Sequence, residues 1–435
     1  MVSIGIRLED KSEWEARVPF TPDQVKKLVQ ELNLEINIQP SNIRAFTDKE
    51  YKSVGANITE NIWDSKVIFA IKEIPIRYIF PNNIYVFFSH VIKGQEYNMP
   101  LLRKILDQNC TLIDYEKIID EKNRRLIFFG NYAGLAGMID TLWVLGQRLK
   151  YEGYSTVLGK VLPAHKYNSL EEAKSELSNL GNQLKDQSLP KEISPLVFGF
   201  LGYGNVSKGA QEILDCFSTE EIKPENLDKF LTSNDNSKEI FYKTVYYEKD
   251  LVQPIKQEIE FELQDYYNHP EKYESKFDPS LHTVLVNAIY WEKKYPKFVT
   301  KRWLKKAYNK NLSPKLKVIG DISCDKEGAI EGTIKITSSD EPVFVYDPQS
   351  DQALMGFKGN GPVILAIDNL PCELPKESST YFGNKLLPYV KEILKIDLNN
   401  SFNNQDIAKE IYNAIITFKG ELTPNFSYLR KYLSK

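Results

Sequence analysis

The sequence of 435 residues has little of what metal centres, membrane spans and nucleic-acid interfaces require. Its four cysteines lie far apart and form no CxxC pair, and its four histidines show no metal-ligand spacing, so we expect no bound metal. No apolar run approaches the roughly 20 residues that span a bilayer. The formal net charge of -3 provides no large basic field for nucleic acid. We therefore expect a soluble globular protein that binds neither nucleic acid nor a membrane.

The chain does have enough length and apolar content for two sizeable domains. A hydrophobic content of 42% is sufficient for packed cores, and 435 residues exceed one typical domain. The N-terminus, MVSIGIRLED, passes directly from alternating apolar residues into charged ones, without the pattern of a signal peptide. We therefore expect a cytoplasmic location with reduced thiols.

Strand-like and helix-like segments alternate along the first 130 residues. Val2, Ile4 and Ile6 alternate as in a strand. Thr21 followed by Pro22 predicts a helix start, because Thr is a good N-cap and Pro is favoured at the first helical position. Further strands are predicted at 67–71, 84–88, 111–115 and 126–129, with a helix at 99–108 between them. This alternation favours a parallel α/β sheet.

The remainder of the chain is less regular. Residues 131–150 predict a long, mostly apolar helix suited to bridging two domains, and a polar helix is predicted around 169–185. A strand is predicted at 196–201. Residues 218–280 are rich in Glu, Lys, Asn and Tyr and receive no assignment, and the tail from about 366 predicts helices.

Two glycines follow the strand at 196–201 and open a predicted helix. Gly202 would permit the tight turn, and Gly204 would let the backbone approach a pyrophosphate at the helix N-terminus. The third glycine, Gly209, falls two positions later than in the usual dinucleotide-binding motif, and we expect it to allow close helix–strand packing. An ordinary strand-to-helix turn is the alternative, and the residues alone leave both open.

An acidic residue about 20 positions beyond the glycines would favour ribose binding. Glu221 and Glu225 both fit this spacing, and Lys223 lies between them. These residues therefore leave NAD and NADP both open.

Polar residues follow several of the apolar runs. Because ligands bind at the carboxyl ends of parallel strands, these positions are candidates for a site. They are Lys72, Glu73, His90, Glu116, Asp321, Asp325 and Asp368. Lys72 and His90 could form an acid–base pair, since a buried Lys shifts towards neutrality and His titrates there. Arg17 could clamp a substrate carboxylate. Each residue alone is more often solvated or structural, and only their coincidence indicates a site.

A series of longer motifs occurs in order along the chain. They are EARVPFTP (15–22), the KE of IKEIP (72–73), FFSHVIKGQEYNM (87–99), LIDYEKI (112–118), GNYAGLAGMI (130–139), GYGNVSKGAQ (202–211), NAIYWE (287–292), GDIS (320–323) and AIDNLPCELPKESSTYFG (366–383). Together they resemble the lysine-ketoglutarate reductases, the saccharopine dehydrogenases that use lysine, within the alanine dehydrogenase and transhydrogenase superfamily. The resemblance extends from the first strand nearly to the C-terminus.

The resemblance implies an α/β fold of two Rossmann-like domains with parallel sheets, separated by an active-site cleft. Residues 1–130 and 366–435 would form the substrate (catalytic) domain, and residues 131–365 the dinucleotide-binding domain. GYGNVSKGA looks like the family's own version of the cofactor turn, so the late third glycine is expected. The implied cofactor-binding residues are Gly202, Gly204, Asn205, Val206, Gly209, Glu225 and Asp325, the last beside the nicotinamide end.

The resemblance also implies roles for the strand-end residues. Arg17 would hold a substrate carboxylate, and Lys72 and His90 would be the catalytic acid–base pair. The remaining implied substrate-pocket residues are Glu73 and Glu116, near the lysine amine, and Asp368, near the hinge between the domains.

The implied activity is the reversible condensation of L-lysine with 2-oxoglutarate and reduction of the imine to saccharopine. NADP(H) is the favoured cofactor and NAD(H) the alternative. Bifunctional relatives continue into a saccharopine-oxidising half, whereas this sequence ends at KYLSK, so we expect that activity to be missing and left to a separate enzyme as partner. The alternatives are another amino-acid dehydrogenase, such as alanine dehydrogenase, and a non-catalytic nucleotide-binding protein on the same fold.

Overall fold

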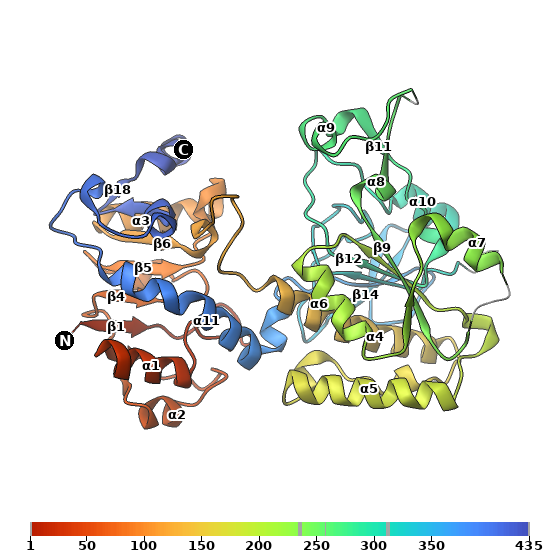
Figure 1. Ribbon diagram of the computed structural model, residues 1–435, viewed down its shortest axis with the longest axis horizontal. Helices are drawn as coiled ribbons and strands as arrows, with labels where there is room; N and C mark the ends of the chain where they lie inside the picture. Colours follow the sequence, from red (N-terminus) through yellow and green to blue (C-terminus); the bar gives the residue numbers. More distant parts are fainter. Residues whose placement is uncertain (1, 234–236, 257, 310–313, 434–435) are drawn as a thin grey trace. The chain divides into compact units, whose positions relative to one another are not determined.

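The computed structural model describes residues 2–233, 237–256, 258–309 and 314–433. The chain forms two compact units (Figure 1). Unit 1 comprises Met1–Phe129 and Pro375–Lys435, and unit 2 comprises Gly130–Leu374. Residues 366–374, which the sequence analysis groups with the N-terminal part, therefore lie in unit 2. No helix in the described ranges is long and apolar enough to cross a membrane.

Unit 1 is built on an eight-stranded sheet in the order β18-β17-β6-β5-β4-β1-β2-β3. The six strands from β6 to β3 are parallel, whereas β17 and β18 join the β6 edge antiparallel. The strands are β1 (Ser3–Ile6), β2 (Glu35–Ile38), β3 (Asn57–Ile58), β4 (Val67–Phe69), β5 (Ile84–Phe87), β6 (Thr111–Asp114), β17 (Ile415–Phe418) and β18 (Glu421–Leu422). The central strands are short apolar runs that are completely buried, as a sheet covered on both faces requires.

The helices of unit 1 come from both ends of the chain. They are α1 (Pro22–Leu32), α2 (Asp48–Ser53), α3 (Met99–Asp107), α11 (Pro375–Leu394), α12 (Lys409–Ala414) and α13 (Arg430–Leu433). At the start of α1 the Thr21 backbone N–H donates to the Gln24 side chain, and Pro22 occupies the first turn as predicted. The predicted strands at 67–71, 84–88 and 111–115 are confirmed as β4, β5 and β6.

Two predictions for unit 1 are wrong. Residues 126–129 form no strand, because their side chains enter the core from a loop: Ile127 is buried, and the ring of Phe129 stacks on Phe382 with centroids 4.6 Å apart. The tail is not only helical, since the apolar run at Ile415–Phe418 pairs with β6 as an added strand. Both segments depend on distant partners that periodicity does not reveal.

Unit 2 contains a second eight-stranded sheet, in the order β15-β14-β16-β13-β12-β7-β9-β8. The strands from β16 to β8 are parallel, and β14 and β15 are antiparallel. The strands are β7 (Val197–Leu201), β8 (Thr219–Glu221), β9 (Phe241–Tyr246), β12 (Val284–Asn287), β13 (Val318–Asp321), β14 (Val343–Asp347), β15 (Gln352–Met355) and β16 (Val363–Leu365). The α/β class with two Rossmann-like units is thus confirmed.

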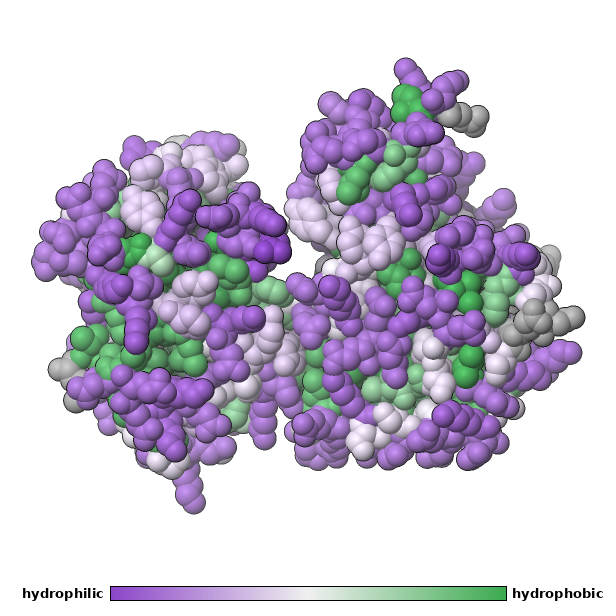
Figure 2. All heavy atoms as spheres, viewed as in Figure 1, coloured by the Kyte–Doolittle hydropathy of each residue, from purple (hydrophilic) through white to green (hydrophobic). Residues whose placement is uncertain are grey.

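The helices of unit 2 include α4 and α5, drawn below the strands in Figure 1. The helices are α4 (Gly130–Tyr151), α5 (Leu170–Asp186), α6 (Asn205–Leu214), α7 (Leu227–Thr232), α8 (Glu248–Leu251), α9 (Leu263–Asn268) and α10 (Lys301–Ala307). A two-stranded ribbon of β10 (Val252–Pro254) and β11 (Tyr273–Ser275) extends from this unit. Figure 2 shows hydrophilic side chains over most of the face viewed, with hydrophobic atoms in smaller areas.

Helix α4 lies within unit 2 from its first residue and packs closely against α6. A Cβ atom on Gly134 of α4 would lie 1.9 Å from the Val206 carbonyl oxygen. A Cβ atom on Gly209 of α6 would lie 2.2 Å from the Asn131 carbonyl oxygen. Gly209 therefore serves helix–helix packing, and the expected helix–strand contact is corrected.

Candidate active site

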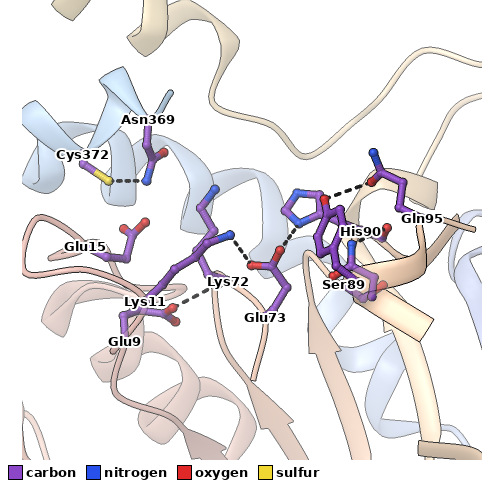
Figure 3. A network of polar contacts seen from close by, with 12 residues as sticks. Glu9, Lys11, Glu15, Lys72, Glu73, Ser89, His90, Gln95, Asn369 and Cys372 are labelled. Carbon is purple, nitrogen blue, oxygen red and sulfur yellow. Dashed lines mark hydrogen bonds and ion pairs between the residues drawn. The ribbon is translucent and has the colours of Figure 1, made fainter. Parts of the chain in front are cut away.

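Side chains that follow neighbouring parallel strands meet in unit 1. Strands β4 and β5 pair in parallel, so the residues after them emerge at the same edge of the sheet. His90 Nδ1 lies 2.6 Å from Glu73 Oε1, and Lys11 Nζ lies 2.8 Å from Glu73 Oε2 (Figure 3). Glu73 thus contacts both the imidazole of His90 and the ammonium of Lys11.

The charge state of Glu73 follows from these contacts. Burial alone would raise its pKa, but the hydrogen bonds from His90 and Lys11 outweigh burial and lower the pKa to about 2. Glu73 is therefore a carboxylate at neutral pH and accepts the Nδ1 hydrogen of His90. This leaves Nε2 of His90 as the ring nitrogen that can exchange a proton.

The backbone of His90 is also unusual. Its φ of 54° places it in the left-handed region, which non-glycine residues rarely adopt and which is found at functional sites more often than elsewhere. The Asn98 side chain donates to the His90 carbonyl oxygen at 3.0 Å and holds this conformation. His90 is the N-cap residue of the short 3₁₀ helix Val91–Lys93.

Lys72 is positioned through its backbone. Its N–H donates to Glu9 Oε2 at 3.0 Å (Figure 3). The preceding N–H of Ile71 donates to Glu9 Oε1 at 2.6 Å. Glu9 is buried, and burial raises its pKa to about 7, with the neighbouring Glu15 adding to the shift. The segment that carries Lys72 and Glu73 is therefore held by a carboxylate that follows β1.

Arg17 forms a two-point ion pair with Glu15. Its Nε donates to Glu15 Oε1 at 2.7 Å and its Nη2 to Glu15 Oε2 at 2.6 Å, and both side chains are buried. The guanidinium also lies over the Phe129 ring, 4.2 Å from the centroid. The predicted substrate clamp is therefore a rigid group whose charge is already shared with a neighbouring carboxylate.

Glu116 follows β6 in the 3₁₀ helix Tyr115–Lys117, and its Oε1 lies 2.5 Å from Arg125 Nη2. Its backbone N–H donates to Asp114 Oδ1 at 2.8 Å, and the Ser89 N–H donates to Asp114 Oδ2 at 3.0 Å. Burial raises the pKa of Asp114 to about 6, and the charge of Glu116 contributes. Asp114 thus ties the ends of β5 and β6 together.

The glycine turn lies in unit 2 at the carboxyl end of β7. Gly202 has a φ of +94°, and a Cβ there would lie 2.8 Å from Ile289. Gly204 is exposed, and a Cβ on it would have no atom within 4 Å. Because α6 begins at Asn205, its first N–H groups have no partner inside the helix. The turn therefore offers open backbone donors of the kind that bind a pyrophosphate.

A cavity of about 400 Å³ opens beside this turn. Aromatic side chains dominate its lining, which consists of Gly202, Tyr203, Gly204, Tyr246, Glu248, Leu251, Tyr266, Tyr267, Ala288, Ile289, Tyr290, Trp291, Tyr295 and Phe298. No Lys, Arg or His is among these lining residues, and Glu248 is the one acidic residue in the set. The cavity suits a flat, largely neutral group beside the turn.

Glu248 lines the cavity, whereas Glu225, the acidic residue that the sequence predicts for cofactor binding, is not among the lining residues. Tyr267 Oη donates to Glu248 at 2.6 Å and Tyr203 Oη at 3.2 Å. The strand beside β7 is β9 rather than β8, which follows α6 in sequence but lies at the sheet edge. Glu225 is exposed near that edge strand and does not line the cavity, whereas Glu248 directly follows Tyr247 at the end of β9.

Asp325 and Asp368 also lie in unit 2, away from the cavity lining. Burial raises the pKa of the Cys324 thiol, and the nearby charges of Asp321, Asp368 and Asp325 add to the shift. The structure thus gathers these carboxylates around one thiol. Within the described residues, no group of three or more His, Cys, Asp or Glu is arranged to hold a metal ion.

Several residues of these centres were not predicted from the sequence. Glu9, Asp114 and Glu248 all lie at or just after a strand, so the strand-end rule that selects Lys72 and His90 applies to them as well. Glu15 carries a different signal, since it stands two positions before Arg17. Residues 218–280, which received no assignment, contain Glu248 and three of the six tyrosines of the cavity, Tyr246, Tyr266 and Tyr267.

Comparisons with known proteins agree with this architecture. Models of the alanine dehydrogenase/PNT family match twice: the N-terminal domain at residues 5–136 and the C-terminal domain at residues 275–425. A solved L-alanine dehydrogenase covers 99% of this chain, and the chain covers 100% of it, with a TM-score of 0.64 and 16% identity. At that identity the likeness concerns the fold alone.

Curated relatives share more of the sequence. "Alpha-aminoadipic semialdehyde synthase, mitochondrial" of Bos taurus is 35% identical over 98% of this chain, which covers 47% of that protein. The chain thus spans about half the length of this relative. "Saccharopine dehydrogenase [NAD(+), L-lysine-forming]" of Candida albicans is 28% identical over 90% of this chain and 92% of its own length.

Proposed function

The chain belongs to the alanine dehydrogenase/PNT family, and we propose that it is a nicotinamide-dependent oxidoreductase that acts on a carbon–nitrogen bond. Its specific reaction would be the condensation of L-lysine with 2-oxoglutarate and reduction of the imine to saccharopine. The names of the bovine and Candida albicans relatives support the substrate class. The observation that carries the proposal is the contact of Glu73 with His90, beside Lys72.

The lysine ε-amine has an unperturbed pKa of about 10.4, so it must lose a proton before it attacks the keto carbon. His90 is suited to accept that proton at Nε2, because the Glu73 carboxylate bonds its Nδ1 and stabilises the imidazolium that forms. Loss of water from the carbinolamine then needs an acid. The imidazolium of His90 and the ammonium of Lys72 are both donors of the required kind.

The remaining side chains of unit 1 would bind and orient the substrates. Glu73 carries a full negative charge that favours a cationic amine over a neutral one. Arg17 would contribute to binding of a substrate carboxylate, with Glu15 fixing the plane of its guanidinium. Asp325 and Asp368 retain their proposed places beside the nicotinamide end and near the hinge, respectively.

The dinucleotide would bind at the glycine turn of unit 2, where the open space in front of Gly204 and the free donors of α6 fit a pyrophosphate. When bound, the reduced nicotinamide supplies the hydride that converts the iminium to an amine. We propose NAD(H) in place of the NADP(H) that the sequence analysis favours. Glu248 supports this choice, because a carboxylate at the end of the strand beside β7 suits a ribose hydroxyl and repels a 2′-phosphate.

An assay of nicotinamide oxidation across pairs of amines and keto acids tests the function. We expect turnover with L-lysine and 2-oxoglutarate, and mass spectrometry should detect saccharopine.

The variants Lys72→Met and His90→Gln should each reduce turnover by roughly 10²–10⁴, the usual contribution of general acid–base catalysis. Alanine formed from pyruvate and ammonia, with no saccharopine, would instead assign the chain to the alanine dehydrogenases. Nucleotide binding without turnover on any pair would favour a non-catalytic protein.

A further inference from the structure

Glu9 connects the end of one strand to the candidate catalytic residues at the end of the next. Strands β1 and β4 are parallel neighbours, and Glu9 follows β1 while Lys72 follows β4. Glu9 is buried, with only 5% of its surface exposed. Its two carboxylate oxygens accept the backbone N–H groups of Ile71 and Lys72, at 2.6 and 3.0 Å.

This carboxylate has no ion-pair partner in the described part of the chain. Arg7, on the same segment, donates to Asp10 at 2.7 Å, and Arg17 is paired with Glu15. The charged groups that act on Glu9 are Glu15, which disfavours its ionisation, and Arg7, which favours it only weakly. A further titratable group near Glu9 is the buried hydroxyl of Tyr115, the residue that directly follows β6. Burial therefore disfavours the ionised form of Glu9, and the two peptide N–H donors are the main groups that stabilise it.

We propose that Glu9 is a positioning residue for the reaction assigned above: its ionised carboxylate fixes the peptide that carries Lys72 and Glu73. This inference rests on the proposed function. Through Lys72 the carboxylate would place the ammonium, and through Glu73 it would place the ring of His90. The geometry is that of a clamp on the backbone, because Glu9 contacts neither reacting side chain directly in the hydrogen bonds that it makes.

Protonation would open this clamp. A protonated carboxyl group has a donor on one oxygen, so it cannot accept N–H groups on both oxygens without rotating or losing one bond. Burial, aided by Glu15, raises the pKa of Glu9 to about 7. The clamp is therefore intact above neutral pH and released below it, which should give turnover an acid limb in this range.

The test compares Glu9→Gln with Glu13→Gln, an exposed glutamate on the same segment that serves as the matched control. Turnover with L-lysine and 2-oxoglutarate is measured from pH 5.5 to 9, and NADH affinity by direct titration. In Glu9→Gln we expect kcat to fall by roughly 10–100-fold, the cost of a misplaced catalytic group. The acid limb should be lost while NADH affinity is unchanged. Glu13→Gln should match the wild type throughout.

A second measurement does not depend on activity. The folded pKa of Glu9 is above its ordinary value of 4.5, so the folded state keeps a proton that the unfolded chain releases between about pH 4.5 and 7. Across that window the wild type should lose stability relative to Glu9→Gln as the pH rises, measured as the difference in urea midpoints.

The proposal would be overturned if Glu9→Gln had a reduced kcat but the pH profile of the wild type, and if the difference in urea midpoints did not change with pH. Glu9 would then be only a hydrogen-bond acceptor whose protonation does not matter. Wild-type kcat and pH profile in Glu9→Gln would overturn it as well. If the wild type turns over no substrate pair, the proposed function fails and the positioning role fails with it. The pH-dependent stability difference would then still report whether Glu9 binds a proton, so the two failures are distinguishable.

Discussion

Glu248 is the acidic side chain among the lining residues of the cavity beside the glycine turn, and the proposed preference for NAD(H) depends on its charge. Two tyrosine hydroxyls donate to it, which holds the carboxylate at the cavity wall. A ribose hydroxyl can donate to the same carboxylate, whereas a 2′-phosphate would bring like charges together in a cavity without a basic lining residue.

Replacing Glu248 by arginine should therefore change the cofactor preference. We expect the wild type to bind NADH more tightly than NADPH, and Glu248→Arg to shift the ratio of the two dissociation constants by roughly 10–100-fold towards NADPH. Fluorescence titration of both nucleotides measures this ratio. Glu225→Arg is the matched control, because Glu225 is exposed beyond the cavity, and it should leave the ratio unchanged. An effect at Glu225 and none at Glu248 would restore the assignment made from sequence spacing.

At the scale of elements, the same glycine motif performs two different tasks. Gly204 faces open space at the start of α6, whereas Gly209 lies against α4. Gly204→Val should leave the protein folded and weaken nucleotide binding, since its side chain would fill the space in front of the helix N-terminus. Gly209→Ala should destabilise the fold by roughly 1–3 kcal/mol, because its Cβ would overlap the Asn131 carbonyl.

Nucleotide titration and urea unfolding of both variants separate these two effects. A destabilised Gly204→Val variant would contradict the assignment of Gly204 to the ligand, as would unchanged affinity. A Gly209→Ala variant with wild-type stability would show that α4 and α6 can move apart, against the contact that the structure describes.

Elements were predictable from sequence where local pattern determines them, and not where distant partners do. Strands β4, β5 and β6 are compact apolar runs, and α1 carries its own start signal in Thr21 and Pro22. Strand β17 exists because β6 offers an open edge, and the order of β8 and β9 is a property of the sheet. The spacing rule predicts Glu225 after the edge strand β8, whereas the proposed Glu248 follows β9, the neighbour of β7, and that strand order is not readable from sequence spacing.

At the scale of the whole molecule, the chain forms unit 1, then unit 2, and then returns to unit 1. Family motifs indicated this division in outline, because they place strand-end residues in the first part and the glycine turn in the second. The end of unit 2 was harder to locate. Residues 366–374 follow β16 and remain with unit 2, where Leu370 packs into its core, and only Pro375 begins the returning helix α11.

Buried carboxyl groups should make the stability of the whole molecule depend on pH. Burial, as the largest cause, raises the pKa of Glu9 to about 7 and those of Asp114 and Asp321 to about 6, and raises that of Asp140 well above its usual range. Each group binds a proton more tightly folded than unfolded, so each contribution to stability is lost as the pH rises through its window. His282 acts in the opposite direction, because burial lowers its pKa to about 3.

Between about pH 5 and 8 the carboxyl groups with lowered pKa values are already ionised, so the raised groups titrate there against His282 alone, and stability should decline from a maximum near roughly pH 5. Below about pH 4 stability should fall again, because carboxylates with lowered pKa values, such as Glu73, begin to gain protons. Urea midpoints measured at pH 3, 5, 6.5 and 8 test this course. Asp321→Asn removes one of the raised groups and should reduce the decline that occurs up to about pH 6, whereas the exposed Glu13→Gln should not. A midpoint that is higher at pH 8 than at pH 5 would mean that these carboxyl groups are ionised in the folded protein at ordinary pH, and that paired charges rather than buried protons dominate its stability.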